Sequence, residues 1–160
     1  MTSGVPSELS LALADRETAL RGRAVGRVLD LATTSFDEVT GRYDTILSVV
    51  RTPAEPDLGR FLGRIRDHLA SDGWAYFLEP TVRTGPLGRA LGISGRLGRP
   101  LTGLHLDRDI PAAIRGAGLF VADLHRFEIA SVAAPFRPFV EAWARFPSPR
   151  TGDGLSPPRS

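Results

Sequence analysis

The sequence YDTILSVV at residues 43–50 is the clearest β-strand of the chain. It is apolar and rich in β-branched side chains, and it ends at Arg51-Thr52-Pro53, a sequence typical of a turn. Apolar residues then recur at helical spacing, which predicts an amphipathic helix over 57–70. The sequence WAYFL at 74–78 predicts a second buried strand. A helix thus lies between two buried strands, as in the repeating unit of α/β proteins.

The same alternation continues on both sides of this unit. Toward the N-terminus the pattern predicts a helix over 6–20 and a short buried strand over 25–32, followed by polar turns from 33 to 42. Toward the C-terminus it predicts strands over 119–129 and 136–146. Helices that alternate with apolar strands indicate an α/β sandwich with a mainly parallel sheet. In such sheets ligands bind at the carboxyl ends of the strands.

The remaining segments define the loops and the end of one domain. Residues 81–103 are rich in Gly, Arg and Pro and predict a loop. Asp107 is the expected N-cap of a helix that runs to Ala117. The Pro/Gly/Ser-rich residues 147–160 are expected to form a disordered tail, which leaves residues 1–146 as a single α/β domain.

The composition is that of a soluble globular protein of one domain. The chain has 160 residues, of which 42% are hydrophobic and 24% are charged. It contains no cysteine, which excludes disulfides, cysteine-ligated zinc and a thiol nucleophile. It has neither an apolar run long enough to span a membrane nor a secretory signal, so we expect a cytoplasmic protein without membrane contact.

All 20 basic residues are arginine, and lysine is absent. This usage indicates the GC-rich coding bias of an actinobacterium-like genome. The net charge is only +2, and no dense basic run with interleaved aromatic residues occurs. The sequence therefore does not predict nucleic acid as a partner.

Four segments together resemble the class I S-adenosylmethionine (SAM)-dependent methyltransferase family, in its methyltransferase type 11-like form. VLDLA at 28–32 resembles the first strand of the family, and YDTILSVV at 43–50 resembles the fourth. LGRIRDHLASDGWAYFLEP at 62–80 resembles the helix and fifth strand that follow. GLHLDRDIPAAIRGAGLFVADLHRFEI at 103–129 resembles the next helix and the sixth strand, so that the likeness covers roughly residues 10–146.

The sequence departs from the family pattern after the first strand. The family has a glycine-rich turn there, whose backbone approaches the ligand and points amide donors at it; this chain has Ala32-Thr33-Thr34-Ser35. The ten residues from 33 to 42 cannot hold the second and third strands with their helices. The resemblance therefore implies a truncated Rossmann-like sandwich of about five strands, in the family order 1-4-5-7-6.

This order would leave the strand at 25–32 on an exposed edge. A bare edge strand presents unpaired backbone groups and invites pairing. We expect the N-terminal helix or a loop to cover this edge, or a second copy of the chain to pair with it and form a homodimer.

The resemblance implies SAM as the cofactor, bound at the carboxyl ends of the strands. The candidate cofactor-binding residues are Asp30, Ala32 and Thr33 after the first strand and Ser48 and Arg51 after the fourth. The alternatives are a turn or cap role for Asp30, loop hydrogen bonding for Ser48 and a solvated charge for Arg51.

Two further residues are candidates for contact with a substrate. Glu79 ends the fifth strand, and its alternative role is a hydrogen bond within the loop. His105 is the candidate general base, because histidine titrates near neutral pH, and its alternative role is an ordinary polar contact. No histidine spacing suggests metal ligands, so we expect no metal site.

Two functions remain open on these grounds. One is a SAM-dependent methyltransferase that transfers a methyl group to a small-molecule acceptor. The other is a catalytically inactive methyltransferase-like module that acts by binding a protein or a ligand. A third hypothesis, which the sequence does not distinguish from the second, is a deletion product without function. Methyl transfer needs mainly the positioning of donor and acceptor, so cofactor binding distinguishes the two functions.

Overall fold

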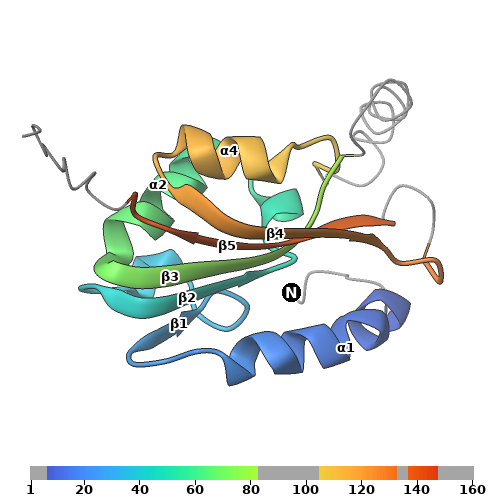
Figure 1. The fold of residues 1–160 in the computed structure, drawn as a ribbon, viewed down its shortest axis with the longest axis horizontal. Coiled ribbons are helices and arrows are strands. Elements are labelled where there is room, and N and C mark those ends of the chain that lie inside the picture. Colours follow the sequence, from blue (N-terminus) through green and yellow to red (C-terminus); the bar gives the residue numbers. More distant parts are fainter. Residues whose placement is uncertain (1–6, 83–104, 133–136, 148–160) are drawn as a thin grey trace, which may run out of the picture.

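The computed structural model of the chain describes residues 7–82, 105–132 and 137–147 (Figure 1). Most of the predicted loop at 81–103 and of the predicted tail at 147–160 lies outside these ranges.

Five strands form one sheet in the order β1-β2-β3-β5-β4. β1, β2 and β3 pair in parallel, and β5 is antiparallel to both β3 and β4. Four strands therefore run in one direction and β5 opposes them, as the predicted order 1-4-5-7-6 requires. The strands are β1 (Val28–Asp30), β2 (Tyr43–Val49), β3 (Leu69–Pro80), β4 (Phe120–Glu128) and β5 (Pro138–Arg145).

Helices cover both faces of this sheet. Figure 1 shows α2 (Leu58–His68) and α4 (Ile110–Gly116) on one face and α1 (Ser7–Gly22) on the other. Two short 3₁₀ helices lie in the loops that leave the sheet, η1 (Phe36–Glu38) after β1 and η2 (Thr52–Ala54) after β2. The structure is the predicted α/β sandwich, with η1 as the only regular element in the short connection from β1 to β2.

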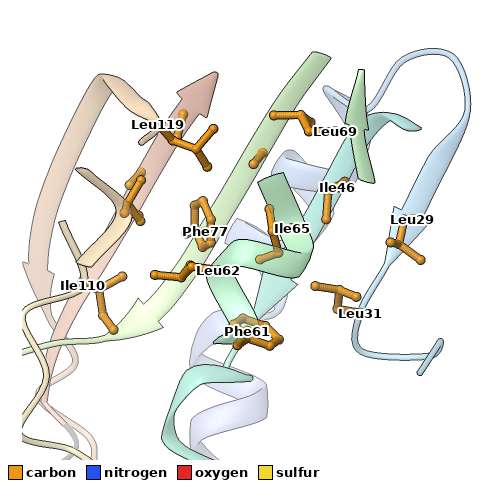
Figure 2. Close-up of a cluster of buried hydrophobic side chains, with 14 of the residues drawn as sticks. Leu29, Leu31, Ile46, Phe61, Leu62, Ile65, Leu69, Phe77, Ile110 and Leu119 are labelled. Carbon is orange, nitrogen blue, oxygen red and sulfur yellow. The ribbon is translucent and has the colours of Figure 1, made fainter. Parts of the chain in front are cut away.

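The larger core lies between the sheet and the helices α2 and α4. Leu62 and Ile65 of α2 point at Ile46 and Phe77 of the sheet, as Figure 2 shows, and all four side chains are fully buried. The amphipathic pattern that predicted α2 therefore marks the side of the helix that packs on the sheet.

The second core lies between the sheet and α1. Leu9, Leu13 and Leu20 of α1 are buried against Leu47 and Leu78. The spacing of these three leucines predicted the helix, and the structure places all three on one side of it.

The helix that precedes β4 differs from the prediction in its cap. Asp109, and not Asp107, is the N-cap, because its side chain accepts a hydrogen bond from the Ala112 amide at 3.1 Å. Pro111 lies in the first turn, where a missing amide donor costs little. The helix begins at Ile110, and its N-cap lies two residues later than predicted.

The first strand is shorter than the predicted segment 25–32. Gly26 has a φ of 66°, and its neighbours bond to side chains of β2 instead of continuing the strand. The Arg27 amide donates to Asp44 Oδ2 at 2.7 Å, and the Val25 amide donates to Thr45 Oγ1 at 3.0 Å. A Cβ at Gly26 would collide with the Asp44 carboxylate, so this turn requires glycine.

The helix α1 does not cover the edge of β1, and pairing of this edge with a second copy of the chain stays a prediction. α1 packs on the face of the sheet, and Val28 of β1 remains 41% exposed. Within the described ranges, no further strand pairs with β1. Its short length limits the number of backbone groups that this edge presents.

Replacing Phe77 by Ala is expected to lower the free energy of unfolding by about 3–5 kcal/mol, because it opens a cavity under α2. Phe120, which is 52% exposed on β4, provides a matched control, and Phe120→Ala is expected to cost less than about 1 kcal/mol. Urea unfolding followed by circular dichroism measures both values. Equal losses for the two variants would contradict the core described above.

Candidate functional site

The loops after β1, β2 and β3 meet at the carboxyl edge of the sheet. The parallel register brings the ends of these strands side by side. Ser48 and Arg51 both donate hydrogen bonds to Glu79 there. Asp30–Thr33 form a separate turn at the end of β1. The predicted site residues are thus divided between two neighbouring loops.

The turn after β1 uses its own backbone donors internally. Asp30 Oδ1 accepts the Ala32 amide at 2.9 Å, and the Asp30 carbonyl accepts the amides of Thr33 at 3.2 Å and Thr34 at 3.0 Å. The Leu31 amide donates to the backbone of β2. All four amides are therefore engaged, and this turn presents no donors of the kind that a glycine-rich loop offers to a ligand.

Asp30 has the geometry of a turn residue. Its second carboxylate oxygen, Oδ2, accepts a hydrogen bond from Arg21 Nε at 3.1 Å, at the end of α1. The Thr33 hydroxyl also turns inward and donates to the Asp30 carbonyl at 3.2 Å. Both predicted residues are thus bonded within the protein.

The Glu79 carboxylate joins the ends of β3 and β2. Its Oε1 accepts from the Ser48 hydroxyl at 2.6 Å and from the Arg51 amide at 3.1 Å. Its Oε2 accepts from the Thr52 amide at 3.1 Å and from the Thr52 hydroxyl at 2.9 Å. Glu79 and Ser48 are fully buried, so these four bonds occupy the carboxylate completely. Glu79 holds the loop after β2 and has no exposed oxygen for a substrate.

Burial dominates the electrostatics of this group. Loss of hydration raises the pKa of Glu79 above its usual value of 4.5, and the hydrogen bonds from Ser48, Arg51 and Thr52 oppose that rise. Within the described ranges, no arginine or histidine forms an ion pair with it. The carboxylate is therefore stabilised by oriented hydrogen-bond donors and not by a counterion.

The loop that Glu79 holds is strained and clamped from a second side. Val50 has a φ of 48°, a left-handed conformation that is costly for a β-branched residue. The Arg108 guanidinium donates to the carbonyls of Thr52 and Glu55, each at 2.6 Å. The Glu79 carboxylate therefore fixes amides of this loop, and the Arg108 guanidinium fixes carbonyls of the same loop.

His105 reaches the same loop through its backbone. Its amide donates to the Pro53 carbonyl at 2.8 Å, and its side chain is half-buried. Arg108, three residues later, has a larger structural role that the sequence did not indicate. Its hydrogen-bond acceptors are backbone carbonyls, which leave no pattern in a sequence.

A pocket of about 290 Å³ opens at the carboxyl edge, between η1, the loop after η2 and the start of α2. Phe36 and Phe61 line it, with their rings edge to face at 5.6 Å between centroids. The charged groups around it are of both signs, and Arg64 pairs with Asp37 at 3.3 Å. The remaining lining residues are Glu55, Pro56, Asp57 and Arg60.

The part of the chain that the structure describes holds no cluster of three or more His, Asp or Glu side chains arranged to bind a metal ion. None of its helices combines the length and the apolar character needed to cross a membrane.

Comparison with known proteins identifies the fold. No protein-family model matches the chain, and no curated protein matches it. Mitomycin 7-O-methyltransferase MmcR is 19% identical, with a TM-score of 0.46; the comparison covers 85% of this chain and only 39% of MmcR. A protein of Bacillus halodurans C-125, provisionally described as a methyltransferase, is 11% identical, with 72% of this chain and 70% of that chain covered and a TM-score of 0.53.

The chain has a shortened class I methyltransferase fold. The first, fourth and fifth strands of that fold correspond to β1, β2 and β3 here, and its sixth and seventh strands correspond to β4 and β5. No counterpart of the second or third strand occurs among the described residues. The turn after β1 leads directly through η1 into β2.

Replacing Glu79 by Gln is expected to lower the free energy of unfolding by about 1–3 kcal/mol. The glutamine Nε2 would face backbone amides of the β2 loop, so that one donor meets another. Glu38→Gln, on the exposed side of η1, is the matched control and should leave stability unchanged. An unchanged unfolding midpoint for the Glu79 variant would show that the four bonds do not stabilise the fold.

The raised pKa of Glu79 also predicts a pH dependence. Above pH 4.5 the folded protein retains a proton that the unfolded chain releases, so the contribution of Glu79 to stability falls as the pH rises through the raised pKa. The unfolding free energy of the wild type, minus that of Glu79→Gln, should therefore be largest at low pH. Denaturant titrations between pH 4 and pH 8 test this, and a difference that grows with pH would contradict it.

Proposed function

We propose that this protein is of the SAM-dependent methyltransferase type and binds the nucleoside end of SAM in the pocket between η1 and α2. The observation that carries the proposal is the position of this pocket. It opens at the carboxyl edge of a mainly parallel sheet, beside the connection from β1 to β2, and α/β proteins bind their ligands at this edge.

The chemistry of the lining residues supports a nucleoside. Phe36 and Phe61 provide an aromatic wall for a base. The carboxylate of Asp37, whose side chain is 86% exposed, is available to accept hydrogen bonds from ribose hydroxyls. A volume of about 290 Å³ is at the small end for ligand pockets, so it suits a nucleoside better than a whole SAM molecule.

The glycine-loop position does not fit the rest of the cofactor. The amides of Leu31, Ala32, Thr33 and Thr34 are all engaged within the protein, so the turn after β1 does not hold the amino-acid end. When bound, SAM supplies an electrophilic methyl group, and the acceptor in this proposal is a small molecule. Among the candidates for substrate contact, Glu79 has no exposed oxygen, which leaves His105.

A second candidate function rests on the same observation, that the amides of the turn after β1 are hydrogen-bonded within the protein. Without a loop that holds the amino-acid end, the chain would act as an inactive methyltransferase-like module that binds another ligand or a protein. The two functions differ in one measurable property, which is the affinity of the single chain for SAM.

Isothermal titration calorimetry with SAM and S-adenosylhomocysteine, on protein of known oligomeric state, tests the proposal. We expect micromolar binding, and Asp37→Asn should weaken it about tenfold through loss of a charged hydrogen-bond acceptor. Asp67→Asn, an exposed position on α2 outside the pocket, is the matched control and should bind as the wild type does. No heat at millimolar SAM would overturn the proposal in favour of the inactive module.

A further inference from the structure

Arg51 carries a guanidinium whose hydrogen bonds are incomplete. Its Nε is buried and has no hydrogen-bond partner among the described residues. Its Nη2 is 3.5 Å from Glu55 Oε1, which is long for a charged hydrogen bond. A buried donor without a partner is unfavourable, so this arrangement requires an explanation.

The geometry of the guanidinium indicates which partner is missing. Nε and Nη2 lie on the same edge of the group, and a carboxylate that approaches this edge can accept from both nitrogens at once. Glu55 reaches only Nη2 and leaves Nε unpaired. The site is therefore half filled by a carboxylate of the protein itself.

The backbone of Arg51 is held where a ligand can meet it. The strained Val50 precedes it, and its own amide is bound by the buried Glu79. The Arg51 side chain is 35% exposed at the carboxyl edge, and its partner Glu55 lines the pocket. Residues in strained conformations persist where the surrounding structure fixes them, and they concentrate at ligand sites.

We propose that Arg51 binds the carboxylate group of a small-molecule ligand, which takes the place of Glu55 on the Nε and Nη2 edge. The inference rests on the proposed function, in which the nucleoside end of SAM lies in the neighbouring pocket and its amino-acid carboxylate reaches Arg51. The carboxylate that the turn after β1 does not hold is thus held by the loop after β2. Glu55 occupies the site until the ligand arrives.

The test compares SAM with decarboxylated SAM, which differs from it only by the carboxylate, in calorimetric titrations. We expect the wild type to bind SAM at least about tenfold more tightly than the decarboxylated compound. Arg51→Ala should reduce the affinity for SAM to that for decarboxylated SAM and leave the latter unchanged. Arg66→Ala, on the exposed side of α2, is the control and should change neither affinity.

Two readouts separate ligand binding from a structural role. Glu55→Gln removes the competing charge and should tighten SAM binding, whereas loss of a structural ion pair would weaken it or leave it unchanged. Arg51→Ala should leave the melting temperature of the ligand-free protein nearly unchanged, because removal of the unpaired Nε donor offsets the loss of the long, partly exposed pair with Glu55. A lower melting temperature together with equal weakening of both ligands would overturn the proposal.

Sodium acetate provides an arm that does not depend on SAM. Acetate should shift the Nε–H resonance of Arg51 in a saturable manner, and sodium chloride at equal ionic strength should not. If SAM does not bind and acetate does, the proposed function fails while the carboxylate site stands. If acetate leaves the resonance unmoved, the inference about Arg51 is wrong whatever SAM does.

Discussion

The buried carboxylate of Glu79 is the constraint on which the carboxyl edge of this protein depends. It accepts four hydrogen bonds from the end of β2 and the loop that follows, and it does so without exposure to water. Val50, with its strained backbone, and Arg51 both lie between Ser48 and Thr52, the two residues whose side chains bond to this carboxylate. Of the two roles that the sequence left open for Glu79, substrate contact and a hydrogen bond within the loop, the structure shows the second.

The sequence predicted the order of the elements well. YDTILSVV at 43–50 and WAYFL at 74–78 are both central strands, because uninterrupted apolar runs mark strands that are buried on both faces. The N-cap of the helix before β4 was predicted at Asp107, two residues before the observed N-cap, Asp109. Two aspartates precede Pro111, and only the structure tells which one reaches the amides of the first turn.

The candidate site was predictable in its location but not in its chemistry. Ser48, Arg51 and Glu79 do meet at the carboxyl edge, as residues at the ends of neighbouring parallel strands must. Which of them is buried depends on the path of the loop after β2, and that path is fixed by Arg108 from a distant segment. Long-range bonds to backbone carbonyls leave no mark on residue types or spacing.

The face of the sheet under α1 has another consequence. Within the described ranges one helix covers it, and arginines lie over the aromatic side chains beside that helix. Arg16 lies 3.7 Å from the ring centre of Phe127, and Arg23 lies 4.3 Å from that of Trp143. Both arginines also pair with Glu141 on β5. The apolar surface beside α1 is thus covered by side chains that keep their charge at every physiological pH, and their charged ends hold water over rings that would otherwise be bare.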